Sequence, residues 1–265
     1  MEILRGFAEK FEQVSVDEAY LVPVDSKSFD DAVLCAQRTK VEVKQQEGIT
    51  CSVGIGPNKL IAKIASGFQK PDGLTVVNPE VVIAFLFPLP VSKIPGIGRK
   101  TTEILKEMGI TKVEELANFK VQVLNQVFGK MGILMKQRAN GIDIDAVEER
   151  EGVKSISRHI TFDDDTDDPE KIAKCVEMLS DGVHSNLMKN HCLFRTVTIV
   201  VRLNNFSTFT RAKTVPIWTS DMNVIEKTAI ELISEFQDRK LRLVGVGVTK
   251  LRERDEKQSL IVDFT

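Results

Sequence analysis

Two adjacent carboxylates, Asp17 and Glu18, are the residues whose types and spacing best suit catalysis. They lie between two strand-like stretches, Gln13–Val16 and Tyr20–Val24, so we expect them at a turn. Neighbouring side chains on a strand point to opposite faces, whereas at a tight turn they can converge. Converging carboxylates suit a pair of divalent cations, which lie about 3.5–4 Å apart in two-metal sites. A solvated turn is the alternative.

Two glycine-containing turns resemble phosphate-binding loops without matching them. Gly54–Lys59 has a lysine where a dinucleotide-binding loop has its third glycine, and no Gly-Lys-Ser/Thr follows; Gly96–Thr101 fails in the same way. The second turn fits a helix-hairpin-helix better, since Gly96 and Gly98 would let backbone N–H groups reach a DNA phosphate at a helix N-terminus. Lys100 adds charge there. An ordinary corner between helices is the alternative.

The elements that must position the carboxylates alternate between helix and strand. Helical spacing, with Ser26 or Ser28 as the cap, predicts a helix over Ser28–Gln46. The same reasoning predicts helices over Met1–Lys10 and Asn58–Phe68, strands over Ile49–Ile55 and Leu74–Val77, and a turn over Lys70–Gly73.

The rest of the chain is helical and then mixed. Residues 79–140 have helical periodicity with short Gly- or Pro-marked connections, and residues 141–154 are acidic and predict a linker. A β-α-β-β-α-β order, the split βαβ pattern, follows. Its strands are predicted over Ile156–Phe162, Thr196–Leu203, Arg211–Pro216 and Leu241–Leu251, and its helices over Pro169–Lys189 and Ser220–Phe236.

These segments together resemble the Y-family DNA polymerases, the DNA polymerase IV type that copies past lesions. The resemblance rests on Val14–Tyr20 and Thr50–Gly73 (palm motifs), Ile94–Gly98 (thumb hairpin), Ser155–Arg158 (start of the little finger) and a clamp-binding tail. It implies an α+β multidomain fold. The implied parts are a partial palm sheet with helices (1–77), an all-helical thumb (78–140), a linker (141–154), a little finger (155–252) and a tail (253–265).

The resemblance also implies roles for the candidate residues. Asp17 would bridge two Mg²⁺ ions, and Glu18 would hold the ion that activates the primer 3′-hydroxyl. Lys70 would pair with the incoming deoxynucleoside triphosphate, while Lys59 and Lys63 face either DNA or water. DNA-binding roles fall on Gly96, Gly98, Lys100, Arg158, Arg211, Lys213 and Arg242. We expect one face of the little-finger sheet to carry both helices and the other face to follow the DNA backbone.

The last residues match a sliding-clamp box. Gln258, Ile261 and Phe264 have the box spacing, and Thr265 stands where a second aromatic is expected. A tail that packs back on the little finger is the alternative.

Composition limits the classes of protein. No run of 18 apolar residues suggests a membrane span. The four scattered cysteines predict free thiols in the cytoplasm. A net charge of −2 is unusual for a DNA-binding protein, but positive charge concentrates in residues 78–140. We expect a monomer.

Two functions follow. One is a lesion-bypass DNA polymerase using primer-template DNA. Since family members begin with a metal-binding Asp and a fingers region that do not precede Met1 here, we expect N-terminal truncation and little activity. The alternative is a non-catalytic module that binds DNA and the sliding clamp.

Overall fold

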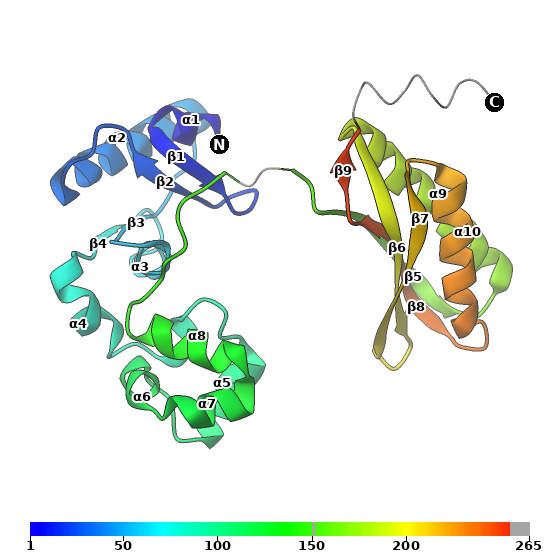
Figure 1. The fold of residues 1–265 in the computed structure, drawn as a ribbon. Coiled ribbons are helices and arrows are strands. Elements are labelled where there is room, and N and C mark those ends of the chain that lie inside the picture. The colour runs from blue at the N-terminus through cyan, green and yellow to red at the C-terminus, as the bar shows by residue number, and fades with distance from the viewer. Residues whose placement is uncertain (150–151, 255–265) are drawn as a thin grey trace. The chain divides into compact units, whose positions relative to one another are not determined.

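The computed structural model describes residues 1–149 and 152–254 and divides the chain into two compact units, residues 1–150 and 151–265 (Figure 1). Each unit has its own hydrophobic core. Within the described residues, no helix is long and apolar enough to cross a membrane. The α+β multidomain fold class is confirmed.

The first unit begins with a short helix and a hairpin. Helix α1 (Glu2–Gly6) is followed by strands β1 (Ala8–Gln13) and β2 (Ala19–Pro23), which pair antiparallel. The predicted helix over Met1–Lys10 is therefore wrong beyond Gly6. Phe11 lies opposite Leu21 and is buried, so long-range pairing overrides the local helix propensity of this stretch.

Two capped helices follow the hairpin as predicted. Helix α2 (Phe29–Glu47) begins at Ser28, whose Oγ accepts a hydrogen bond from the Asp31 amide, so Ser28 rather than Ser26 is the cap. Helix α3 (Lys59–Ser66) begins at Asn58, whose side chain accepts from the Ile61 amide. Strands β3 (Val53–Ile55) and β4 (Leu74–Val76) pair parallel, separately from β1 and β2. The expected single sheet is thus two ladders.

The predicted helical region is helical and shares a core with α3. It contains α4 (Val82–Leu86), α5 (Arg99–Glu107), α6 (Val113–Asn118), α7 (Val121–Phe128), α8 (Lys130–Ala139) and 3-10 turns at Pro79–Val81 and Val91–Lys93. Buried Ile61, Leu86, Leu105 and Leu124 belong to this core.

Residues 141–149 of the predicted linker lie against the first unit. The Gly141 carbonyl accepts a hydrogen bond from Asn58 Nδ2 at 2.9 Å, and Asp143 Oδ2 accepts from the Leu60 amide at 3.0 Å. Arg5 and Glu149 form an ion pair at 2.6 Å. The acidic residues of this segment therefore cap α3 and bind α1.

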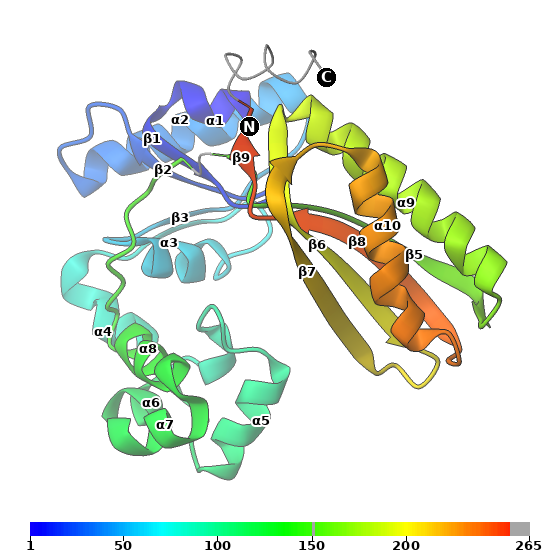
Figure 2. The same cartoon turned by 45° about the vertical axis from the view of Figure 1, so that its right-hand side comes forward.

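The second unit is a sheet with two helices on one face (Figure 2). Its elements are β5 (Ser155–Thr166), α9 (Pro169–Lys189), β6 (Cys192–Leu203), β7 (Thr208–Thr219), α10 (Met222–Ile233) with a 3-10 turn at Ser234–Phe236, β8 (Leu241–Thr249) and β9 (Arg252–Glu253). The order β5-β8-β6-β7 is antiparallel throughout, so β5 and β6 are parallel with β8 between them. This confirms the split βαβ pattern. Strand β9 pairs with the start of β6.

Candidate active site and DNA-contact residues

The carboxylate turn forms the connection between β1 and β2. The Val14 and Ser15 amides donate to the Glu18 carbonyl, at 2.9 and 3.2 Å, and close the turn. The Ser15 hydroxyl donates to Asp17 Oδ1 at 2.6 Å. Asp17 is exposed, so its carboxylate is open to a ligand from solution.

The positive charges of two lysines act on this turn. Lys63, on α3, forms an ion pair with Glu18. The pKa of Asp17 is lowered by the Ser15 hydroxyl, by its own backbone N–H and by the charges of Lys63 and Lys70. The structure therefore places Lys63 at the turn of Asp17 and Glu18, and the charge of Lys70 also acts on Asp17. The sequence pattern did not pair Lys63 with Glu18; its side chain remains 36% exposed to water in this ion pair.

Lys59 has a different role from that of Lys63. Its Nζ lies 2.8 Å from Glu12 Oε2 and 5.6 Å from the centre of the Tyr20 ring. Glu12 is 5% exposed. Lys59 therefore bridges α3 to the hairpin from within the unit instead of facing DNA or water. Burial, followed by the charge of Glu18, raises the pKa of Tyr20, which keeps that phenol neutral at physiological pH.

The carboxylates are too few for a complete metal site. Within residues 1–149 and 152–254, no three His, Cys, Asp or Glu side chains gather closely enough to hold a metal ion. Asp17 and Glu18 fit one side of a magnesium site, since Mg²⁺ is held by one or two carboxylates together with substrate phosphates and water. They fit the donor set for two ions only in part.

We predict that Ser15→Ala raises the pKa of Asp17 toward the ordinary value for an aspartate, because the hydroxyl hydrogen bond is the largest cause of its lowering. The lysine charges remain, so some lowering should persist. A carbon-detected NMR titration of the Asp17 carboxyl measures this. Ser66→Ala is the control, since the Ser66 hydroxyl donates to a backbone carbonyl. An unchanged Asp17 pKa in Ser15→Ala would contradict the assignment.

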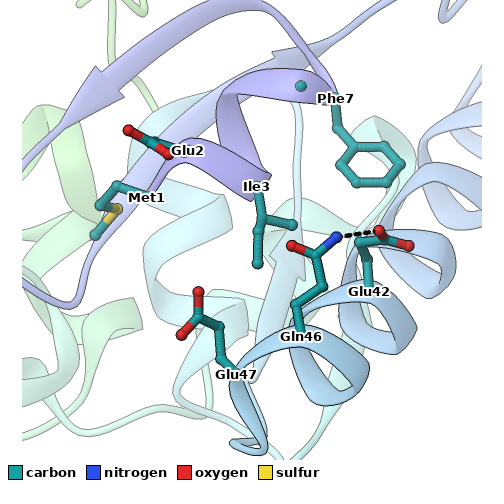
Figure 3. Close-up of a pocket in the computed structure, with 8 residues that line it drawn as sticks. Met1, Glu2, Ile3, Phe7, Glu42, Gln46 and Glu47 are labelled. Atoms are coloured by element: carbon teal, nitrogen blue, oxygen red, sulfur yellow. Dashed lines mark hydrogen bonds between the residues drawn. The ribbon is translucent and has the colours of Figure 1, made fainter.

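A hollow of the first unit lies away from this turn. A hollow of about 720 Å³ lies between α1 and α2 and is lined by Met1, Ile3, Phe7 and three glutamates (Figure 3). Glu2, Glu42 and Glu47 supply negative charge, and Gln46 donates to Glu42. Neither carboxylate of the turn lines it, and its charge does not suit a triphosphate.

The predicted thumb hairpin has the backbone shape that its glycines allow. Gly96 has φ +90, in the left-handed region, and Arg138 Nη1 donates to the Pro95 carbonyl beside it at 2.8 Å. Gly98 begins α5, and nothing lies within 4 Å of where its Cβ would stand. Lys100 is exposed in the first turn of α5. The hairpin thus presents open backbone and positive charge at one place.

The register of the second unit corrects the expected placement of its cations. Arg158 lies opposite the buried Val246, and Arg211 and Lys213 lie opposite the buried Ile199 and Val197. These three cations therefore point to the face that carries the helices, and placing them on the open face was wrong. Ion pairs agree with this: Arg211 pairs with Glu235 at 2.7 Å and Lys213 with Glu231 at 2.6 Å. Arg242 lies 3.5 Å from Asp165 at the β5–β8 irregularity.

The open face of the central sheet, opposite the two helices, carries mostly uncharged side chains in the following two rows. Thr161, Leu243, Arg202 and Thr208 form one cross-strand row on it, and Ser157, Gly247, Thr198 and Ala212 another. Sequence reasoning missed Arg202, although strict alternation with the core residues Val201 and Leu203 is a signal that places it on this face.

Comparisons with known proteins agree with this geometry. Residues 1–67 match the "impB/mucB/samB family", residues 79–110 the "IMS family HHH motif" and residues 153–260 the "impB/mucB/samB family C-terminal domain". DNA polymerase IV 2 of Methanosarcina mazei is 63% identical over all of this chain, which covers 72% of that protein. DNA polymerase IV of Methanoculleus marisnigri is 44% identical, again over all of this chain, which covers 74% of it.

Solved structures show the same likeness. The Y-family DNA polymerase chimera Dbh-Dpo4(243-245)-Dbh is 27% identical with a TM-score of 0.87, covering 96% of this chain and 74% of the chimera. The insertion ternary complex of Dbh DNA polymerase is 26% identical with a TM-score of 0.64, and the match covers 96% and 74% of the two chains. The chain belongs to the DNA polymerase IV family of Y-family DNA polymerases, which carry out DNA-directed DNA synthesis past lesions.

Proposed function

We propose that the turn at Asp17 and Glu18 is the carboxylate part of the nucleotidyl-transfer site and that Lys70 faces the incoming triphosphate. The observation that carries this proposal is the ion pair of Lys63 with Glu18 beside the exposed Asp17, whose pKa the charges of Lys63 and Lys70 lower. Magnesium, when bound, would lower the pKa of the primer 3′-hydroxyl. Asp17 can hold it as a carboxylate, and its lowered pKa keeps it ionised at lower pH than an ordinary aspartate.

Lys63 sets a condition on this site. Its ammonium pairs with Oε1 of Glu18, so a cation that takes this oxygen has to displace Lys63 from it. A triphosphate attracts an ammonium group more strongly than one carboxylate does, because it carries several negative charges. Lys63 and Lys70 would then neutralise substrate phosphates while Asp17 and Glu18 hold the cation.

We propose primer-template DNA and deoxynucleoside triphosphates as the partners of this chain. Two solved relatives are described as an insertion ternary complex and a post-insertion binary complex of a DNA polymerase, which supports the proposal. The thumb hairpin at Gly96, Gly98 and Lys100 would hold the DNA backbone. The monomeric state and the cytoplasmic location stay predictions.

We predict that Gly98→Val combined with Lys100→Glu weakens DNA binding about tenfold at 0.1 M salt and lowers the salt dependence, since one phosphate contact contributes about 0.9 to the slope. The valine fits without overlap in the protein, so it should block backbone access and leave the fold intact. Fluorescence anisotropy with labelled primer-template DNA measures this. Lys106→Glu, in the last turn of α5, matches the charge change and should bind like the parent chain. Equal DNA affinities of the two variants would show that the hairpin is not the DNA-binding site.

We also propose that the tail binds a sliding clamp. Gln258, Ile261 and Phe264 lie outside the described residues, and their spacing alone supports this. Phe264→Ala should weaken clamp binding about tenfold or more, because burying a Phe side chain contributes roughly 1.5–3 kcal/mol. Thr265→Phe should tighten it. Titrating a Gln258–Thr265 peptide and the full chain with the clamp tests both changes. If the peptide does not bind, and if Phe264→Ala leaves the clamp affinity of the full chain unchanged, the tail does not bind the clamp through this box.

The second candidate function, a module that binds DNA without chemistry, is favoured by the incomplete carboxylate set. The two candidates share the thumb hairpin and the tail. They differ at Asp17, which matters for catalysis and not for holding DNA.

A further inference from the structure

A cluster of cations around the chain's single tryptophan lies where β6, β7 and β9 meet. The guanidinium of Arg252 lies 4.7 Å from the centre of the Trp218 ring, and that of Arg195 lies 5.8 Å from it. All three residues belong to the second unit and come from three different strands. The sequence pattern gave none of them a role, because β9 and the late part of β7 were not predicted.

The contacts of Arg195 differ from those of three other strand cations. Arg211, Lys213 and Arg242 each have a carboxylate within 4 Å. Among the described residues, Arg195 contacts the Val215 carbonyl, at 3.4 Å, and the indole. A guanidinium held against a ring keeps its planar fork of N–H donors, which suits two-point hydrogen bonds to a phosphate.

A hollow of about 560 Å³ adjoins this cluster and extends its positive charge. Arg252 lines it together with Lys154, Lys250 and the carboxylate of Glu253. Lys250 has φ +53, in the left-handed region that lysine seldom adopts, and it stands between β8 and β9. Strained backbone of this kind gathers at functional sites. Three cations against one carboxylate make the hollow suitable for an anionic ligand.

We infer that Arg195, Trp218 and Arg252, with the adjoining lysines, form a binding site for the phosphodiester backbone of a DNA strand. This rests on the proposed function, which brings DNA to the chain. Charge complementarity selects the ligand: a backbone presents successive phosphates, and the two arginines and two lysines present successive cations. The indole holds both guanidiniums in place and does not read a base, so binding here is independent of sequence.

Trp218 makes the site directly observable, because the emission of the full chain comes from one tryptophan. We would titrate the chain with fluorescein-labelled primer-template DNA and follow label anisotropy and tryptophan emission together. Emission should change and saturate at the DNA concentration at which anisotropy saturates. Arg195→Gln with Arg252→Gln should weaken binding about ten- to sixtyfold at 0.1 M salt and lower the slope of log K against log salt by about 1.8.

The matched control removes the same charge from the helices. Lys174→Gln with Lys227→Gln changes exposed residues of α9 and α10 and should leave affinity and slope near those of the parent chain. If the glutamine variant does not fold, Arg195→Lys with Arg252→Lys keeps the charge and should retain the slope while losing affinity. The site would be overturned if the parent chain binds DNA tightly and with salt dependence but its tryptophan emission does not change, and if the arginine variants bind with the same affinity. DNA binding itself would then still hold. An anisotropy that never changes would instead overturn the proposed DNA binding, and this site with it.

Discussion

Residues 1–265, assayed alone with Mg²⁺ or Mn²⁺, should extend a primer at least about a thousandfold more slowly than DNA polymerase IV 2 of Methanosarcina mazei. Two-metal catalysis of phosphoryl transfer depends on cations that stabilise both the attacking and the leaving oxygen. The described residues offer two carboxylates at the turn, and Lys63 already occupies one of them. Weak metal binding removes several kcal/mol of transition-state stabilisation, and each 1.36 kcal/mol is about tenfold in rate.

The assay separates catalysis from DNA binding. Anisotropy with the same primer-template should show that the chain is on the DNA while the primer stays unextended. Asp17→Asn is the matched variant, since it removes one charge from an exposed residue without changing its size. Robust extension that disappears in Asp17→Asn would show that the two carboxylates suffice, and the prediction would be wrong.

Local signals predicted the helices of this chain well. Ser28 and Asn58 stand immediately before α2 and α3, and both side chains accept hydrogen bonds from the first turn of the helix that follows. Caps of this kind act within four residues, so they are readable from the sequence. The turn that holds Asp17 and Glu18 was predicted from the strand-like stretches that flank it, although β1 already ends at Gln13 and residues 14–16 belong to the turn.

The two-residue period of a strand also indicates from the sequence which face each strand residue points to. Arg158 is two residues from both Ile156 and Ile160, and Arg211 is two residues from Phe209. Residues two apart on a strand share a face, so these cations had to share the face of their apolar neighbours. The family resemblance predicts DNA contacts for these cations, whereas the period of two places them on the face that carries the helices.

Strand β1 and its contacts could not be read from local sequence. Glu9, Lys10 and Glu12 are better helix formers than strand formers, and only pairing with β2 holds them extended. Glu12 pairs with Lys59, on α3, 47 positions further along the chain, and also accepts a hydrogen bond from the Glu148 amide at 3.4 Å. No local pattern connects residues so far apart, so the ion pair is visible only in the structure.

The Glu12–Lys59 pair should be necessary for the stability of the first unit. Replacing Glu12 by Leu leaves the Lys59 ammonium largely buried without its carboxylate, and breaking a buried pair in this way costs about 3–5 kcal/mol. Lys59→Met alone should also be costly, because it removes the ammonium from the buried Glu12 carboxylate and leaves its other contacts, among them the Glu148 amide at 3.4 Å. The double change, Glu12→Leu with Lys59→Met, should recover most of the loss, since well-packed apolar residues often replace a buried ion pair without penalty.

Urea unfolding followed by circular dichroism measures the free energies of unfolding, and hydrogen exchange in β1 and α3 assigns the transition to the first unit. The exposed pair Arg99–Glu103 is the control, since surface pairs contribute about 0–1 kcal/mol.

The two ion pairs of α3 connect this stability to the candidate site. Lys59 holds α3 to β1, and Lys63 then reaches Glu18 at the end of the same hairpin. Glu12→Leu should therefore also move Lys63 away from Glu18 and raise the pKa of Asp17. If the single change leaves both the stability and that pKa unaltered, the pair neither stabilises the unit nor positions the turn.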